Sequence, residues 1–182
     1  MDIKELIMSR HSVRSYKADP LSPEVLSDIL EAGRLAPSAQ NRQPWRFIVI
    51  QGTDKIKSLS VNCGLLGLSN FFIRQAPCVI IACADTRRSI RINDQDYYLV
   101  DTAIAFQQMM LMALAHGIGS CWIAAFSEKK LRKWLKIDDK WKIVALSPFG
   151  YPAEKDTLHA RMVSGFARSS NRLPLEQIVH YF

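Results

Sequence analysis

The sequence is poor in cysteine, and its cysteines have neither the spacing of a metal site nor a dense disulfide pattern. There are four: Cys63, Cys78, Cys83 and Cys121. The four histidines are equally scattered, so no cluster of metal ligands is formed. We expect reduced thiols and no metal ion.

Long uninterrupted apolar runs are also missing. The nearest, residues 98–115, is broken by Asp101, Gln107 and Gln108, whereas a membrane-spanning helix needs about 20 mainly apolar residues. Residues 1–5 lack the apolar core of a secretory signal. We therefore expect a soluble cytoplasmic protein without a membrane partner.

Several motifs of nucleotide and hydrolase chemistry are absent. The chain contains no GxxxxGK loop, GxGxxG fingerprint, HExxH or GxSxG. Gly117 and Gly119 form a GxG, but it follows a helical pattern, where a helix terminator is the better interpretation. Asp94 and Asp96 lie in a charged stretch that we interpret as a solvated loop. We identify no catalytic side chain.

The composition is typical of one soluble domain. The chain has 182 residues, of which 48% are hydrophobic and 23% charged. Lys and Arg exceed Asp and Glu by 24 to 17, giving a net charge of +7. This excess fits an anionic ligand, but without interleaved aromatics or a docking helix it does not indicate a nucleic-acid partner. We expect a single domain over residues 1–182.

Apolar periodicity and capping residues predict alternating helices and strands. Helices are expected at 3–7, 23–30, from 53, at 97–116 and at 128–135, and strands at 45–50, 78–84, 119–124 and 141–147. Residues 61–69 and the polar stretch after Pro152 are expected to be irregular. The pattern indicates one α+β domain with an extended C-terminal arm.

The predicted helix at 97–116 is apolar almost all round, so it should lie at the centre of the protein or of an oligomer. A small monomer must leave much of its surface in water, which favours an oligomer. The candidate subunit contacts are Leu99, Ala103, Met110, Leu114 and the segment 178–182.

Three polar segments carry unusual numbers of hydrogen-bond donors. In residues 10–14, Arg10 and Arg14 can converge on one phosphate, because a guanidinium donates two parallel hydrogen bonds; a solvated basic turn is the alternative. Residues 36–45 place amides between two prolines, which suits the edge of a heterocycle or an ordinary capped turn. In the tail, Arg168 and Arg172 flank hydroxyl and amide groups, which suits either a phosphate or a flexible tail.

These segments resemble the nitroreductase family. Residues 10–16 (RHSVRSY) and 36–47 (APSAQNRQPWRF) are similar to its two N-terminal signatures. Residues 117–123 (GIGSCWI), 149–152 (FGYP) and 171–179 (NRLPLEQIV) resemble the segment after its central helix and its closing motifs. The resemblance covers essentially the whole chain and implies an α+β fold: a central, mostly antiparallel sheet flanked by helices, in a homodimer.

The resemblance also implies bound FMN. Arg10 and Arg172 would contact its phosphate, with His11 and Ser12 beside the ribityl chain. Arg14 would lie near flavin N1 and O2, where a cation stabilises the negative charge of the reduced ring.

Further contacts to FMN follow from the same resemblance. Ser38 and Asn41 would reach it from the partner subunit, and Asn70 is a candidate for the pyrimidine edge. Ala124 and Ala125 stand where many members have an acidic residue and a glycine, so only their backbone groups are expected to face flavin N5 and O4.

The implied function is an FMN-dependent oxidoreductase. NAD(P)H would deliver hydride to the flavin, and a small acceptor such as a nitroaromatic or a quinone would then take the electrons at the same face, giving ping-pong kinetics. The alternatives are a flavin reductase or reductive dehalogenase of the same fold, and a non-catalytic flavin-binding module.

Overall fold

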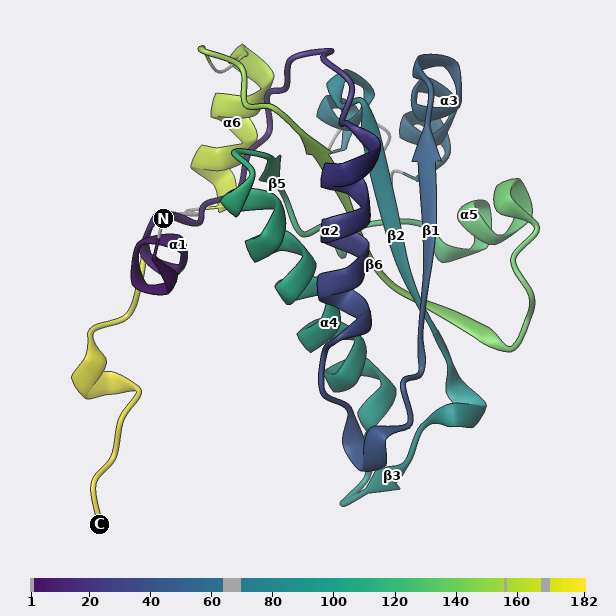
Figure 1. The fold of residues 1–182 in the computed structure, drawn as a ribbon, viewed down its shortest axis with the longest axis vertical. Helices are drawn as coiled ribbons and strands as arrows, with labels where there is room; N and C mark the ends of the chain where they lie inside the picture. The colour runs from purple at the N-terminus through teal and green to yellow at the C-terminus, as the bar shows by residue number, and fades with distance from the viewer. Residues whose placement is uncertain (1, 64–69, 156, 168–170) are drawn as a thin grey trace.

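A four-stranded antiparallel sheet forms the centre of the molecule (Figure 1). The computed structural model describes residues 2–63, 70–155, 157–167 and 171–182. Across the sheet the strands are β1 (Trp45–Gln51), β2 (Cys78–Asp85), β6 (Trp141–Gly150) and β5 (Gly119–Ser120), each antiparallel to its neighbour. This is the mostly antiparallel sheet that we expected.

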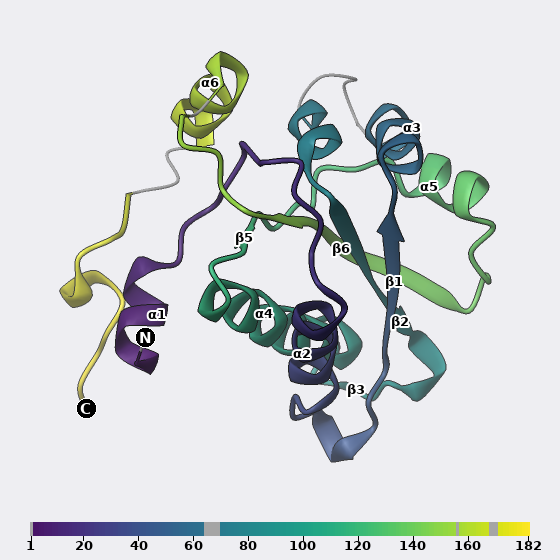
Figure 2. The same cartoon turned by 45° about the horizontal axis from the view of Figure 1, so that its top comes forward.

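Helices cover both faces of this sheet (Figure 2). The helices α2 (Pro23–Arg34) and α4 (Tyr97–Ala115) pack on one face, and α3 (Thr53–Cys63) and α5 (Glu128–Leu135) pack on the other. Every residue of β2 is buried, which its continuous apolar run predicted. Alternate residues of β2 contribute to opposite cores, with Ile80 toward α4 and Ile81 toward α3.

The helix boundaries follow the capping residues of the sequence. Asp2 and Glu5 form a reciprocal capping box at the start of α1 (Ile3–Ser9). The hydroxyl groups of Ser22 and Ser127 accept backbone N–H bonds at the starts of α2 and α5. Beyond α4, Gly117 has a φ of +72°, which fits its predicted role as a terminator.

The long helix α4 is, within the described part of the chain, the one helix long and apolar enough to cross a membrane. It packs here as a core helix, with Phe106, Met109 and Ala113 buried against α2 and the sheet. Met110 is also in this core and only 2% exposed, so its prediction as a subunit contact is wrong. The physical reason is helical spacing, which puts Met110 on the face of Phe106 and Ala113. Leu99 remains 46% exposed.

Some elements differ from the sequence-based expectation. The stretch expected to be a solvated loop contains an exposed hairpin of β3 (Arg91–Ile92) and β4 (Gln95–Asp96), turned by two residues with positive φ, Asn93 and Asp94. Helix α6 (Leu158–Ala167) was not predicted, and α3 continues to Cys63, where irregular chain was expected. The other six residues of that stretch, 64–69, lie outside the described residues.

Short 3-10 helices complete the chain: η1 (Ala39–Asn41), η2 (Phe71–Gln75), η3 (Thr86–Arg88) and η4 (Leu175–Gln177). Residues 171–182 form an arm that extends away from the sheet (yellow in Figure 1). Its large apolar side chains are exposed, including Leu175 at 62% and Tyr181 at 90%.

Candidate functional site

Three distant stretches of the chain form a cavity of about 180 Å³. Arg14 comes from the segment after α1, Asn70 and Phe72 from the start of η2, and residues 121–125 from the chain after β5. Four of the residues that the sequence predicted as cofactor contacts therefore line one cavity: Arg14, Asn70, Ala124 and Ala125.

The backbone of residues 12–16 is fixed against the edge of the sheet. Val13 N–H donates to the Ser120 carbonyl at 3.0 Å, and the hydroxyl of buried Tyr16 donates to the Val13 carbonyl. A Cβ on Gly119 would lie 2.7–2.9 Å from the Val13 side chain, so the close approach of the two segments requires glycine there. This packing places Arg14 in the wall of the cavity.

Arg14 is a buried cation, with 9% of its surface exposed. Its Nη1 donates to Ser164 Oγ of α6 at 3.0 Å. Among the described residues no carboxylate pairs with it. Burying a charge without a partner is costly, so this guanidinium is suited to an anionic ligand in the cavity.

The chain after β5 presents backbone donors. Ile123 and Leu146 exchange two backbone hydrogen bonds, and Cys121 N–H donates to Ser147 Oγ at 3.0 Å. The next two N–H groups, of Ala124 and Ala125, have no acceptor among the described residues. Both residues are exposed and line the cavity, so these donors are available to a ligand.

Asn70 is hydrogen-bonded to the same wall of the cavity. It is 5% exposed, and its Nδ2 donates to the Ala125 carbonyl at 2.6 Å. This bond leaves Oδ1 without a donor in the described part of the chain. Asn70 therefore fixes the position of Ala125 and retains an acceptor beside the cavity.

Cys121 also lines the cavity, and burial raises the pKa of its thiol despite the nearby charges of Arg14 and Arg10. Burial likewise raises the pKa of Cys63 to about 11, and of Cys78 and Cys83 to about 12. All four cysteines are free and buried in this structure. With such pKa values they stay protonated near neutral pH and are poor nucleophiles.

Arg10, His11 and Ser12 precede Arg14 without lining the cavity itself. The Ser12 hydroxyl and the Arg10 charge lower the Cys121 pKa against the larger effect of burial. His11 is exposed, and its Nδ1 lies 2.9 Å from the Ser9 carbonyl oxygen. Ser12 also pairs with Ser120 in an isolated bridge, next to the lining residue Cys121.

Ser38 and Asn41 lie elsewhere in the chain. Their loop runs between α2 and β1 beside β3, at the lower end of Figure 1, whereas β5 and α6 lie toward the upper end. Ser38 Oγ accepts from Gln43 N–H at 2.9 Å, and Asn41 Oδ1 accepts from Gln43 Nε2 at 3.0 Å. Within one chain, these two residues are therefore not brought to the cavity.

The loop that carries Ser38 and Asn41 holds an unfavourable backbone conformation. Gln40, Asn41 and Gln43 have φ values of 53°, 54° and 50°, in the region that favours glycine. Asp101, 2% exposed on α4, helps to hold the loop, since its Oδ1 accepts from Ala39 N–H at 2.9 Å. Its Oδ2 is buried without a partner among the described residues. Strain held by the surrounding structure is common at functional sites.

Arg172 lies on the exposed C-terminal arm, where its Nη1 donates to the Asn171 carbonyl at 2.7 Å. Arg172 is not among the residues that line the cavity. Its predicted companions Arg168, Ser169 and Ser170 lie outside the described residues.

Sequence reasoning missed four residues that shape the site. Phe72 and Trp122 line the cavity, Ser164 holds Arg14, and Asp101 holds the loop at Ala39. Asp101 carried a usable signal, because it is a lone carboxylate inside a strongly apolar helix. The other three are ordinary residues whose role depends on contacts between distant segments.

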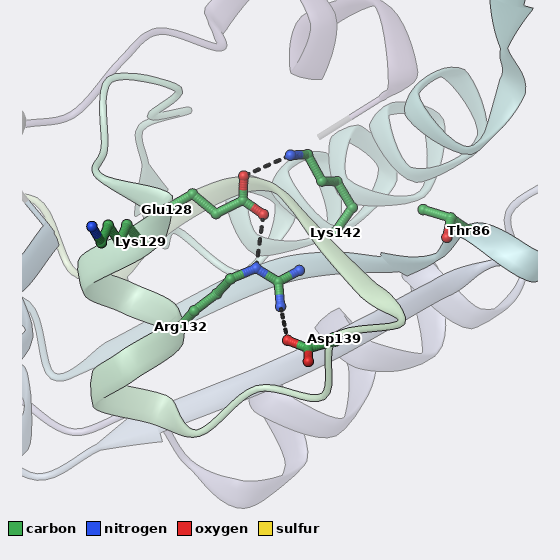
Figure 3. Close-up of a pocket in the computed structure, with 6 residues that line it drawn as sticks. All are labelled: Thr86, Glu128, Lys129, Arg132, Asp139 and Lys142. Carbon is green, nitrogen blue, oxygen red and sulfur yellow. Dashed lines mark hydrogen bonds and ion pairs between the residues drawn. The ribbon is translucent and has the colours of Figure 1, made fainter.

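A larger concavity, of about 550 Å³, lies between the start of α5 and the start of β6 (Figure 3). Four of the five charged residues that line it pair with one another. Glu128 accepts from Arg132 at 3.1 Å and from Lys142 at 2.7 Å, and Arg132 also contacts Asp139 at 3.7 Å. Burial opposes ionisation of Glu128, but these hydrogen bonds bring its pKa below the usual value. We interpret this network as structural, because it connects α5 to the start of β6.

Among the described residues, no group of three or more His, Cys, Asp or Glu side chains could hold a metal ion. The sequence profile of the nitroreductase family matches residues 7–63 and 64–151.

The chain belongs to the nitroreductase family.

Relatives and solved structures agree with this membership. A protein of Archaeoglobus fulgidus, provisionally named an NADH dehydrogenase/NAD(P)H nitroreductase, is 33% identical over 86% of this chain and 89% of its own length. The 4-nitrobenzoate reductase of Pseudomonas putida is 25% identical over 91% of this chain and 94% of its own.

Two structures extend the likeness to the fold. A nitroreductase family protein of Clostridium difficile 630 has a TM-score of 0.82 and 28% identity, covering 100% of this chain and 98% of its own. A protein of Desulfovibrio desulfuricans, solved in complex with FMN, has a TM-score of 0.80 and 25% identity, covering 100% of this chain and 97% of its own.

These findings confirm the resemblance and the fold class predicted from the sequence motifs. Nitroreductases are oxidoreductases, so the chain is an enzyme of that class. The interpretation as a non-catalytic binding module is therefore wrong.

Proposed function

We propose that this nitroreductase binds FMN and uses NAD(P)H to reduce small acceptors such as nitroaromatics or quinones. The Desulfovibrio desulfuricans structure with FMN, the Archaeoglobus fulgidus relative named for NAD(P)H, and the nitrobenzoate reductase of Pseudomonas putida support the three parts of this proposal.

The observation that carries the proposal is the chemistry of the cavity. It combines the buried Arg14 cation, which has no carboxylate partner among the described residues, with the available N–H groups of Ala124 and Ala125. The pyrimidine edge of a flavin is rich in acceptors and gains negative charge on reduction. A fixed cation and fixed backbone donors stabilise such charge without reorganisation.

Each residue then has a defined role. Arg14 would hold N1 and O2, the Ala124 and Ala125 backbone groups would face N5 and O4, and Asn70 would read the pyrimidine edge. Arg10 would contact the FMN phosphate, and His11 and Ser12 would lie beside the ribityl chain.

When bound, FMN supplies the redox chemistry, by accepting hydride from NAD(P)H and passing electrons to the acceptor. The chain binds and orients the flavin and its substrates, and it supplies the electrostatic field around the flavin ring. One cavity that serves donor and acceptor in turn gives ping-pong kinetics, and no side chain is required as a general acid.

We also propose a homodimer, because one chain offers only part of a site. A cavity of about 180 Å³ is below the about 300–1,000 Å³ of complete small-molecule pockets. Ser38, Asn41 and Arg172 do not line it, and exposed apolar side chains on α1, α4 and the C-terminal arm offer a contact surface. Ser38 and Asn41 would complete the partner's site. The free thiols suit a cytoplasmic location.

The test begins with the visible spectrum of the purified protein, followed by release of the flavin by heat and its chromatography. We expect FMN, because the arginines suit one terminal phosphate and no dinucleotide fingerprint is present. Oxidation of NADH and NADPH is then measured with a nitroaromatic, a quinone and free FMN as acceptors. Bound FAD, or a protein that takes up no flavin, would contradict the cofactor; turnover with free flavin alone would indicate a flavin reductase.

A further inference from the structure

A third concave surface lies between α3 and α5, which run side by side on one face of the sheet (Figures 1 and 2). It has a volume of about 600 Å³ and is lined by Val61, Asn62, Lys130, Lys133 and Trp134. This volume lies within the range of about 300–1,000 Å³ for small-molecule sites. Nothing in the chemistry described so far uses it.

The groove is basic. Lys130 and Lys133 are exposed, and within the described residues neither ammonium group has an ion pair or hydrogen bond. Their neighbours differ, since Arg132 and Lys142 are engaged with Glu128. Two unpaired ammonium groups in one concave surface favour a phosphate-bearing ligand.

The remaining lining residues suit a nucleoside. Trp134 packs against the core on one side and lines the groove on the other, and an indole ring stacks well on a base. Asn62 donates its Nδ2 to the Ser58 carbonyl at 2.8 Å, which leaves its amide oxygen as an acceptor. Val61, 67% exposed, adds an apolar contact.

A short stretch of backbone connects the groove to the flavin cavity. Ser127 N–H donates to the carbonyl of Cys63, the last residue of α3, at 2.9 Å. Ala125 lines the cavity, and Lys130 follows five residues later, so their Cα atoms lie within about 18 Å of each other. An extended dinucleotide can bridge this distance.

We propose that the groove between α3 and α5 binds the phosphate-bearing adenosine half of the nicotinamide dinucleotide donor. This inference rests on the proposed function of the cavity, where the nicotinamide ring would react with the flavin. Lys130 and Lys133 bind the phosphates, and Trp134 stacks on the adenine.

The test compares two double variants of the FMN-loaded enzyme. Lys130→Gln/Lys133→Gln removes the groove charges, and Lys129→Gln/Lys136→Gln removes equal charge nearby, outside the groove. Flavin reduction is followed by stopped flow with NADPH, NADH and 1-benzyl-1,4-dihydronicotinamide, a donor without phosphate. Binding of ADP, which lacks nicotinamide, is measured separately by calorimetry.

We expect the groove variant to need about ten-fold more dinucleotide for half-maximal reduction, which is what two exposed ion pairs supply. The limiting rate, the reaction with the phosphate-free donor and the control variant should be unchanged, and ADP binding should weaken only in the groove variant.

Unchanged dinucleotide and ADP binding in the groove variant would overturn the proposal, as would equal losses in both variants. An equal loss with the phosphate-free donor would place the defect in the flavin cavity and also overturn it. A wild-type enzyme that no nicotinamide donor reduces, although dithionite reduces its flavin, would instead refute the proposed function.

Discussion

At the scale of single residues, Arg14 has the most specific expected role. Its guanidinium is buried and, in the described chain, faces no carboxylate. If it lies at flavin N1, its interaction strengthens as negative charge forms there. We expect Arg14→Ala to lower the reduction potential of bound FMN by about 30–65 mV, the equivalent of about 1.5–3 kcal/mol for a charge-assisted hydrogen bond.

The matched control for this prediction is Arg10→Ala, from the same segment. Arg10 is expected at the phosphate, so its loss should weaken FMN binding and leave the potential unchanged. Potentials are measured by dye equilibration and affinities by flavin fluorescence. A large loss of FMN affinity in Arg14→Ala with an unaltered potential would assign Arg14 to the phosphate instead.

Asp101 is the second residue with a sharp expectation. Because Asp101→Ala leaves the Ala39 N–H without its acceptor, we expect it to lower the free energy of unfolding by about 1–3 kcal/mol. Asp101→Asn keeps an acceptor oxygen in place and should cost less. Urea unfolding measures the loss in the free energy of unfolding for both variants, provided that their m-values are unchanged. Equal losses in the two variants would show that the carboxylate charge, rather than the acceptor, holds the loop.

At the scale of elements, the contact between residues 12–13 and β5 sets one wall of the cavity. A methyl group on Gly119 would collide with Val13, a stiff β-branched side chain in the core. We expect Gly119→Ala to destabilise the fold by about 1–3 kcal/mol through overpacking, and to weaken FMN binding by displacing Arg14.

Gly165→Ala is the control for this substitution. Gly165 lies in helix α6, and a Cβ there meets nothing within 4 Å. The change should be neutral or slightly stabilising, since alanine favours helix. Thermal unfolding and flavin titration of the two variants check the contrast. Wild-type stability and affinity in Gly119→Ala would mean that the two segments are not held in close contact.

The elements that the sequence predicted are those with strong local signals. The buried run of β2, the long apolar pattern of α4 and the capped starts of α2 and α5 all had such signals. Strands β3 and β4 have two residues each, and all of these except Asp96 are exposed, so they offer no buried apolar alternation. Helix α6 contains Ser164 and Gly165, which are poor helix formers in its last turn.

At the scale of the whole molecule, the candidate site was predictable only through resemblance. No local pattern relates Arg14, Asn70 and Ala124, which meet because the sheet and its flanking helices bring three distant segments together. The available N–H groups of Ala124 and Ala125 arise where the chain leaves the β5–β6 ladder, a detail of register that composition does not encode. Ser38, Asn41 and Arg172 remain predictions, because their role depends on a second chain.

The final prediction concerns that second chain. We expect a homodimer in which FMN retention and assembly are linked, because a ligand held only by the dimer stabilises the dimer. Leu99 is 46% exposed on α4 and is a predicted contact. Leu99→Asp should therefore shift the protein toward monomer and release FMN, whereas Val61→Asp, which changes an exposed apolar residue on α3, should do neither.

Light scattering at falling protein concentration, read together with flavin fluorescence, measures both quantities in one series. The shared site requires fluorescence to rise over the same concentration range in which the mass falls to that of one chain. It also requires that added FMN lowers the protein concentration at which the wild-type dimer dissociates. In Leu99→Asp, FMN should lower this concentration by a smaller amount. A monomer that keeps its FMN at every concentration would refute the shared site, and Ser38 and Asn41 would then have no route to the cofactor.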